Sequence, residues 1–404
     1  MSNYDIVIIG GGPAGLAAAI YGARARLKTI IINKGTIGGM AHTTREIVNY
    51  PGYGQTSGPK LMADFKKHAE NFGAQFLKDE VVEVDFSQEE KVIKTKKGKE
   101  FTAKAVILGC GTQPRLLNIS GETKLRGSGV AYCATCDAEF FEGEDVVVIG
   151  SGDQAIEEGL YITKFARKVT VVVLHDEGIL DCNKLSAEIA FNNEKMKFIW
   201  NSTIEEVLGA SNVESVKIKN IKTGKSTELV CQGVFFFVGM IPATGFLQNS
   251  GVNMDQKGYI PVNELMETNL EGIYGVGDNR VKYLRQVVSA AGDGATAAVA
   301  AERYIEELNN FRETVVENEQ PVILLFFNPI IEESLALNTV LEKVVSENGY
   351  NYKIIRVDIS RKKMLAERYG VQEAPSAIVL NKGVIIKKLD CVIDEGKISS
   401  QLRK

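Results

Sequence analysis

Two glycine-rich turns, each directly after a run of β-branched residues, constrain the fold more than any other feature. The first is Gly10-x-Gly12-x-x-Gly15, after residues 6–9, and the second is Gly150-x-Gly152-x-x-Ala155, after residues 145–149. In such strand–turn–helix units the glycines permit a tight turn, the approach of a pyrophosphate to the backbone, and close helix–strand packing. The sequence therefore predicts an α/β protein with two Rossmann-like dinucleotide-binding folds.

The order of the expected elements indicates that the second fold is inserted into the first. Helices are predicted over 14–25 and 58–72 and strands over 28–32, 80–85, 91–95 and 103–108. In the second fold we expect strands over 168–174 and 233–242. Gly277-Asp278 then ends another strand, and a helix rich in small residues follows over 286–308. Such a strand end suits the first fold, which is therefore predicted to be discontinuous.

A pair of cysteines separated by two residues, Cys133-Ala134-Thr135-Cys136-Asp137, lies between the two glycine turns. Such a pair can close a disulfide, and one of its thiols is often acidified to the reactive thiolate. Asp137 could handle the proton that disulfide exchange moves. The alternative is half of a zinc site, but the other four cysteines stand singly and the three histidines are not at ligand spacing. We therefore predict a redox dithiol and no metal.

The bulk composition excludes several classes of protein. The net charge of −4 offers no basic surface for nucleic acid. The apolar runs are too short for a membrane span, and the polar start of the chain does not resemble a signal peptide. Six cysteines in 404 residues are not a secreted disulfide scaffold. We expect a cytoplasmic protein.

The last part of the chain is predicted to form a separate α/β domain after a polar, acidic linker. Strands are expected over 322–327 and 352–358, helices over 332–348 and 361–369, and a hairpin over 377–389. The predicted domains are the dinucleotide domain over 1–115 and 245–308, the inserted dithiol domain over 116–244, the linker over 309–320 and the tail domain over 321–404.

Residues 4 to about 308 resemble the low-molecular-weight thioredoxin reductase family. The resemblance rests on the first glycine turn, the dithiol segment and five further motifs: Gly38-Gly39, Asn49-Tyr50-Pro51-Gly52, Glu157-Glu158, Gly277-Asp278 and Arg285-Gln286. It implies an FAD-dependent disulfide oxidoreductase, a thioredoxin-like protein substrate and a homodimer. It also implies an inter-domain rotation between a state in which the dithiol faces the flavin and a state in which the nicotinamide faces it and the dithiol meets its protein substrate.

The resemblance also implies roles for individual residues. Cys136 would lie next to the flavin, Cys133 would attack the substrate disulfide, and Asp137 would be the acid and base. The residues expected to hold FAD are Gly10, Gly12, Pro13, Ala14, Gly15, Gly38, Gly39, Asn49, Gly277, Asp278, Arg285 and Gln286. Asn33 stands where the first fold usually has an acid for the ribose, and it could still bond a hydroxyl.

The chain departs from the family at the NADPH signature. The family's His-Arg-Arg run and a later arginine correspond here to Val173-Leu174-His175 and Ile179. Because each charge-assisted phosphate contact is worth on the order of 1.5–3 kcal/mol, their loss disfavours NADPH. NADH remains open through Asp176 or Glu177, as do ferredoxin and a second FAD as donors. The second nucleotide site would comprise Gly150, Gly152, Asp153, Ala155 and Asp176.

The tail resembles thioredoxin without its chemistry. Phe326-Phe327-Asn328-Pro329 and Glu373-Ala374-Pro375-Ser376 match the approach to the active site and the cis-proline loop, but Ile331 and Ser334 replace the two cysteines. Cys391 is alone. Docking, dimerisation and cofactor shielding stay open as its role. Two alternatives for the whole chain also stay open: an ordinary NAD(P)H-dependent thioredoxin reductase, and a non-catalytic redox sensor or binding module.

Overall fold

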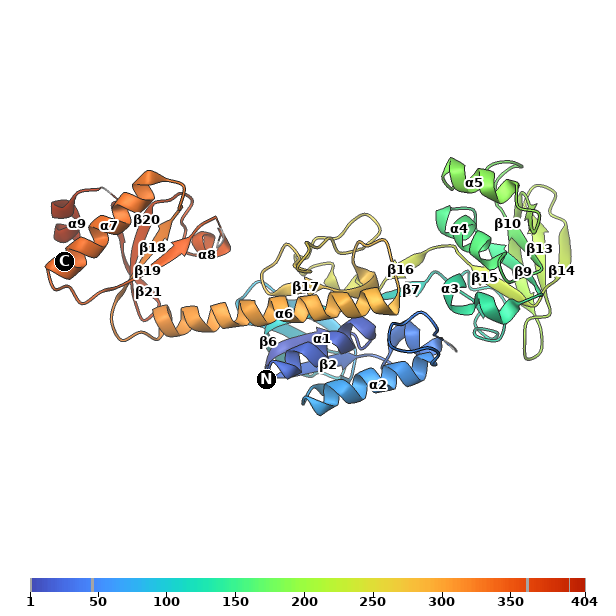
Figure 1. Cartoon of the computed structure of the whole chain (residues 1–404), viewed down its shortest axis with the longest axis horizontal. Helices are drawn as coiled ribbons and strands as arrows, with labels where there is room; N and C mark the ends of the chain where they lie inside the picture. The colour runs from blue at the N-terminus through green and yellow to red at the C-terminus, as the bar shows by residue number, and fades with distance from the viewer. Residues whose placement is uncertain (1, 45–46, 361–362, 392, 404) are drawn as a thin grey trace. The chain divides into compact units, whose positions relative to one another are not determined.

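The computed structural model describes residues 2–44, 47–360, 363–391 and 393–403. The chain divides into two compact units, Met1–Glu302 and Arg303–Lys404 (Figure 1). Within the described residues, no helix is both long and apolar enough to cross a bilayer.

The first sheet of unit 1 has a parallel centre and an antiparallel edge. Its order is β3-β2-β1-β6-β5-β4, with β17 beside β6. The strands are β1 (Ser2–Ile9), β2 (Thr29–Asn33), β3 (Gln75–Lys78), β4 (Val81–Asp85), β5 (Lys91–Thr95), β6 (Glu100–Leu108) and β17 (Ile273–Gly275). The pairing of β17 with β6 returns the chain to this sheet after the second fold, as the sequence predicts.

Strand β1 is the buried centre of this sheet. Ile6 to Ile9 are at most 5% exposed, so both faces of the strand are covered. Helices α1 (Pro13–Arg24) and α2 (Gly58–Asn71) pack side by side, with the short helix η1 (Gly39–Thr43) next to α2. Helix α1 begins directly after Gly12, as the first glycine turn predicts.

The second sheet is parallel throughout. Its order is β11-β10-β9-β15-β8, formed by β8 (Val130–Ala131), β9 (Asp145–Ile149), β10 (Lys168–Val172), β11 (Met196–Ile199) and β15 (Gly233–Phe236). Its helices are α3 (Ala134–Asp137), η2 (Ala138–Phe141), α4 (Asp153–Ile162) and α5 (Lys184–Phe191). An antiparallel sheet of β12 (Ser202–Leu208), β13 (Ser215–Asn220) and β14 (Ser226–Val230) packs on it through a shared apolar core.

The single strand predicted over 233–242 is wrong in extent. The chain forms β15 and then β16 (Met240–Pro242), which belong to different sheets. Gly239, at φ 104°, interrupts the extended run between them. Strand β16 pairs antiparallel with β7 (Thr112–Pro114), so the segments that leave and re-enter the first fold run together.

The rest of unit 1 leads to the long helix α6 (Val287–Phe311) through η3 (Gly245–Leu247) and η4 (Gly277–Asn279). The proposed boundaries at residues 115 and 245 fall close to the β7–β16 pair. They stay a prediction.

Unit 2 is a mixed four-stranded sheet with helices on both faces. Its order is β19-β18-β20-β21, from β18 (Val322–Phe327), β19 (Lys353–Asp358), β20 (Ser376–Asn381) and β21 (Val384–Leu389). Alternate residues of β18 divide between two cores. Ile323 and Leu325 pack with α7 (Glu332–Glu347) and α9 (Glu395–Leu402), while Leu324 and Phe326 pack with α8 (Lys363–Arg368).

The predicted linker over 309–320 is mostly helical. Helix α6 continues to Phe311, and η5 (Arg312–Val316) follows it directly. Val315 is fully buried in the core of unit 2, because this part of the polar segment carries an apolar side chain against the sheet. The predicted helix 361–369 appears as α8, and its first two residues lie outside the described ones.

Gly294 is expected to be essential for the packing of α6 on α1. A Cβ at this position would lie 2.0 Å from the carbonyl oxygen of Ala14, which is backbone and cannot rotate away. Gly294→Ala should therefore lower the free energy of unfolding by about 1–3 kcal/mol, although alanine normally favours a helix by about 1 kcal/mol. Urea unfolding followed by circular dichroism measures the change. Gly292→Ala, two residues away with nothing within 4 Å, is the control and should not destabilise the protein.

Candidate redox site

A large cavity in unit 1 brings together most of the residues that the sequence singles out. Its volume is about 2000 Å³, above the roughly 300–1,000 Å³ of common ligand pockets, so it can hold a ligand of dinucleotide size. The predicted site residues in its wall are Gly10, Gly12, Pro13, Ala14, Gly39, Cys133, Cys136, Asp137, Asp153, Gly277, Asp278, Arg285 and Gln286. The first glycine turn and the dithiol thus face the same space.

Two predicted residues, Gly15 and Gly38, do not line this cavity, whereas Asn33 does. A Cβ at Gly15 would lie 1.9 Å from the carbonyl oxygen of Gly10, so Gly15 allows the turn to close against α1. Gly38 precedes η1 at φ 116°, with Met62 packed against it. Asn33 accepts a hydrogen bond from the Gly11 N–H at 2.9 Å and donates to the Gly35 carbonyl at 2.9 Å. Asn33 therefore holds the turn itself.

Two polar atoms in the wall indicate that the cavity suits a polar ligand. Among the described residues, four buried side-chain atoms have no hydrogen-bond partner, and two of these are Asp278 Oδ1 and Arg285 Nε. Burial raises the pKa of Asp278. The Arg285 guanidinium lies 4.7 Å from the ring centre of Tyr259. A buried acceptor and a buried donor without partners are costly unless a ligand satisfies them, and the hydroxyls and phosphates of FAD fit that need.

Asp293 holds the Gly277–Asp278 turn in place. Its carboxylate accepts hydrogen bonds from the Gly277 N–H at 2.9 Å and from Arg280 at 2.7–2.8 Å. Lys282 donates to it at 2.7 Å, with its side chain 5% exposed. Burial works against the charged carboxylate, but these bonds prevail and lower its pKa. Asp293 is not among the residues that the sequence predicts for the site, although a lone acid among the small residues of α6 is an available signal.

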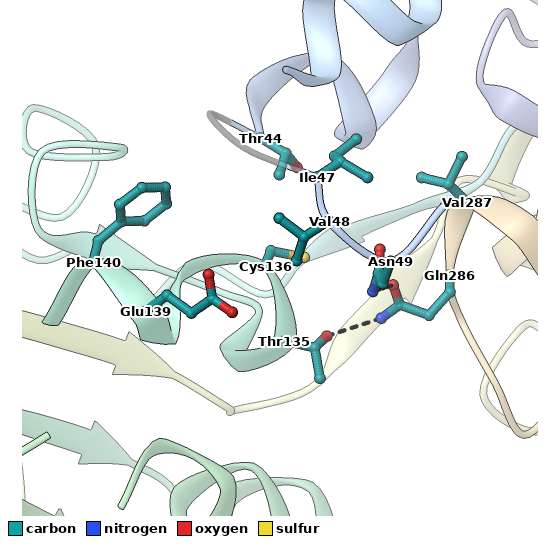
Figure 2. A pocket seen from close by; sticks show the side chains of 10 residues that line it. All are labelled: Thr44, Ile47, Val48, Asn49, Thr135, Cys136, Glu139, Phe140, Gln286 and Val287. Carbon is teal, nitrogen blue, oxygen red and sulfur yellow. Dashed lines mark hydrogen bonds between the residues drawn. The ribbon is translucent and has the colours of Figure 1, made fainter. Parts of the chain in front are cut away.

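The predicted dithiol is a disulfide in this structure. Cys133 and Cys136 are joined, with their Cα atoms 5.3 Å apart. Cys133 precedes α3, and Cys136 lies within it. In Figure 2 the sulfur of Cys136 lies among side chains of the first fold, with Val48, Asn49 and Gln286 around it.

A hydrogen-bonded chain connects the dithiol segment with the first fold. Gln286 donates to Thr135 Oγ1 at 2.9 Å and accepts from the Asn49 amide at 3.2 Å (Figure 2). These residues lie up to 237 positions apart in the sequence. A second contact joins Arg126 to the sulfur of Met40 at 3.5 Å, at the position where the family usually has glutamine. The dithiol therefore faces the cavity from which a flavin would reduce it.

Glu158 supports the dithiol segment from α4. Its carboxylate accepts the backbone N–H of Ala134 at 2.8 Å and also that of Thr135. Asp137 is half-buried and lines the same cavity as the cysteines.

The second glycine turn has a different environment. The space beside Gly152 is open, because a Cβ at this position would meet nothing within 4 Å. Asp181 pairs with Gly152 as an isolated bridge, accepts a hydrogen bond from the Ser151 hydroxyl at 2.8 Å and contacts His175 Nε2 at 2.6 Å. Asp153 accepts from the Asn183 N–H at 2.7 Å. Carboxylates therefore surround this turn.

The positions that correspond to the family's NADPH signature hold no arginine or lysine, and His175 among them contacts Asp181. Val173 is fully buried, Leu174 is 55% exposed and Ile179 is 53% exposed. Asp176 forms an exposed ion pair with Lys222, and this hydrogen bond lowers the pKa of Asp176. Gly150, Gly152, Ala155 and Asp176 do not line the large cavity.

Among the described residues, the remaining cysteines form no further disulfide. No group of three or more His, Cys, Asp or Glu side chains in this part of the chain could hold a metal ion. Burial raises the pKa of both Cys110 and Cys231 to about 12, so these thiols are protonated and unreactive near neutral pH.

A cavity of dinucleotide size with a redox disulfide in its wall defines a nucleotide-linked disulfide oxidoreductase. The family model "Pyridine nucleotide-disulphide oxidoreductase" matches residues 4–294, and the model "Thioredoxin" matches residues 303–404.

Known relatives agree with this class. The chain is 49% identical over 312 residues to a thioredoxin reductase of Peptoclostridium litorale, covering 76% of this chain and 98% of that protein. A thioredoxin reductase of Bacillus subtilis is 42% identical over 313 residues, covering 77% and 98%. The crystal structure of thioredoxin reductase from Streptococcus pyogenes is similar at TM-score 0.70 and 40% identity, covering 76% of this chain and 99% of that chain. The chain therefore belongs to the pyridine nucleotide-disulphide oxidoreductase family, as a thioredoxin reductase-like enzyme whose family implies FAD, with an additional thioredoxin-like domain at its C-terminal end.

Asp278 is expected to contribute strongly to FAD binding. Asp278→Asn keeps the shape of the side chain but removes the charge that strengthens its hydrogen bonds. The dissociation constant for FAD should rise roughly 10- to 100-fold, measured by fluorescence titration of the apoprotein. Asp5→Asn, on β1 and outside the cavity wall, serves as control and should leave the affinity unchanged. An unchanged affinity in Asp278→Asn would remove this residue from the cofactor site.

Proposed function

We propose that this enzyme transfers electrons from FAD through the Cys133/Cys136 pair to the disulfide of a thioredoxin-like protein, and that its electron donor is not NADPH. The observation that carries the proposal is the Cys133–Cys136 disulfide in the wall of a dinucleotide-sized cavity. The relatives at 42–49% identity are thioredoxin reductases, which supports this substrate class.

The residues proposed to hold FAD are the first glycine turn, Gly38 and Gly39, Asn49, the Gly277–Asp278 turn, Arg285 and Gln286. The turn would receive the pyrophosphate at the start of α1, and Asp278 would accept from a ribityl hydroxyl. When bound, FAD would supply the two electrons that open the disulfide.

The chemistry of the protein groups follows from disulfide exchange. Two electrons break the bond between Cys133 and Cys136, and the sulfurs take up protons, one of which Asp137 would supply. Cys133, as thiolate, then attacks one sulfur of the substrate disulfide and the other sulfur of the substrate leaves. Cys136 attacks the mixed disulfide, releases the reduced substrate and restores the Cys133–Cys136 bond.

The C-terminal domain is not proposed to carry electrons. The positions of the thioredoxin cysteines hold Ile331 and Ser334, and Ser334 is fully buried with its hydroxyl accepting from the Asn328 N–H at 3.2 Å. The Ala374–Pro375 peptide bond is cis, as expected from the resemblance of this segment to the cis-proline loop of thioredoxin. The domain keeps the fold without the dithiol, so a separate protein must supply the substrate disulfide.

The surroundings of the second glycine turn support a donor other than NADPH. A 2′-phosphate would meet Leu174 and Ile179 where the family has arginines, and Asp181 and Asp153 add negative charge beside the turn. NADH would need no phosphate site, but Asp176 would have to exchange Lys222 for a ribose. Ferredoxin and a second FAD in the inserted domain stay alternatives.

A homodimer and a cytoplasmic location stay predictions. An ordinary NAD(P)H-dependent thioredoxin reductase remains the main alternative for the enzyme. Steady turnover of thioredoxin disulfide with any donor would exclude the alternative of a non-catalytic redox sensor.

An anaerobic titration of the flavin absorbance should identify the donor. Because the phosphate-binding arginines are absent, we expect no stoichiometric bleaching by NADPH, and full bleaching by dithionite. Stoichiometric bleaching by NADPH would contradict the proposed donor and restore the ordinary reductase. Bleaching by NADH alone would support a role for Asp176 or Glu177, and bleaching by reduced ferredoxin would identify a protein donor. A ratio of two flavins per chain would support a second FAD.

Cys136→Ser should abolish transfer from flavin to disulfide while FAD stays bound, because no disulfide can then form beside the cavity. Stopped-flow reduction of thioredoxin by the dithionite-reduced enzyme measures the loss. Cys182→Ser, in the same fold and with an unpaired thiol, is the matched control and should retain the wild-type rate. A wild-type rate in Cys136→Ser would show that another group carries the electrons.

A further inference from the structure

The carboxylate of Glu158 lies at the start of the helix that carries the dithiol. Its Oε2 accepts the Ala134 N–H at 2.8 Å, and the Thr135 N–H also bonds to this side chain. Ala134 and Thr135 are the first two residues of α3, directly after Cys133. Glu158 comes from α4 and lines the same cavity as both cysteines.

The Thr135 N–H is a donor that a thiolate at Cys133, the residue that caps α3, would otherwise use, because a capping side chain accepts from the second or third N–H of a helix. The first N–H groups of a helix have no partner within the helix, so they can stabilise a negative charge. Cysteines at helix starts are acidified for this reason. Here the Glu158 carboxylate occupies this donor and adds its own negative charge, so a thiolate at Cys133 loses a hydrogen-bond donor and meets a like charge.

The surroundings of Glu158 do not neutralise it. None of the ion pairs formed within the described ranges includes Glu158. The charged side chain that acts on its carboxylate is also an acid, Glu157 on the same helix. Burial raises the pKa of Glu158, and the two N–H groups oppose that rise. Because the carboxylate bonds to the N–H of the residue after Cys133, its charge acts close to that cysteine.

We propose that Glu158 is a positioning residue that makes the Cys133/Cys136 pair a stronger reductant by disfavouring the thiolate at Cys133. Reduction of the disulfide takes two electrons and two protons when both sulfurs become thiols, and two electrons and one proton when Cys133 remains a thiolate. A negative charge beside Cys133 destabilises the second product. The reduced pair then gives up its electrons more readily to a substrate disulfide.

The inference rests on the proposed function, because it takes the dithiol as the group that reduces the substrate. A purely structural role is the competing explanation, since Glu158 also anchors the first turn of α3. Glu158→Gln separates the two, because the amide oxygen can still accept the Ala134 N–H while the charge is lost.

The first measurement is the midpoint potential of the dithiol at about pH 9, in glutathione or dithiothreitol buffers with thiol trapping. Glu158→Gln should make reduction about tenfold more favourable, which corresponds to a shift of about +30 mV for a two-electron couple. Glu157→Gln, an exposed acid one residue earlier on the same helix, is the matched control and should leave the potential unchanged.

The second measurement is the rate at which iodoacetamide alkylates Cys133 at pH 7 in a Cys136→Ser background. Adding Glu158→Gln should raise this rate about threefold, since a tenfold gain in thiolate is partly offset by its lower nucleophilicity. Adding Glu157→Gln should not change it.

The outcomes separate this inference from the proposed function. An unchanged potential and alkylation rate in Glu158→Gln, with a reversible disulfide in the wild type, would overturn the inference and leave the proposed function standing. A wild-type pair that cannot be reduced and reoxidised would overturn the proposed function itself. If Glu158→Ala alone shifts the potential while Glu158→Gln does not, the residue is only a structural anchor and the inference fails.

Discussion

The close approach of backbone to backbone around the first glycine turn is the constraint on which unit 1 depends. A Cβ at Gly10 would lie 2.2 Å from the carbonyl oxygen of Gly109, and one at Gly294 would lie 2.0 Å from that of Ala14. The carboxyl ends of β1 and β6 and the helices α1 and α6 therefore meet without side chains between them. This contact leaves the cavity open above the turn and aims the start of α1 into it.

Three carboxylates have different roles around the cavity. Asp293 is fully paired with Arg280, Lys282 and the Gly277 N–H, so it fixes the turn on which Asp278 stands. Asp278 keeps an unpaired oxygen for a ligand. Glu158 pairs with backbone rather than with a cation, so its charge remains effective at the neighbouring sulfur. A carboxylate can thus hold a turn, accept from a ligand or act on a neighbouring thiol, depending on the partners that the fold gives it.

Two parts of the chain keep a family fold while they lack residues that are typical of that family. The second glycine turn retains its strand and helix, yet carboxylates and apolar side chains surround it. The thioredoxin-like domain retains a strand buried on both faces and a cis-proline loop, yet Ile331 and Ser334 stand in place of the dithiol. Apolar packing maintains such folds whether or not the reactive groups remain, because it depends on buried area and not on those groups.

The sequence by itself determined the elements with strong periodicity or turn chemistry, including both strand–turn–helix units, the strands of the tail and the Cys133/Cys136 pair, because these signals are local. Tertiary structure alone decided that Gly239 divides the run 233–242 between two sheets and that α6 extends through the polar segment after residue 308. It also gave Asn33, Asp293 and Glu158 their partners. The bonds of Asn33 to Gly11, of Asp293 to Gly277 and of Glu158 to Ala134 join residues 16 to 24 positions apart. Their formation depends on the path of the chain in space, which residue type and spacing do not encode.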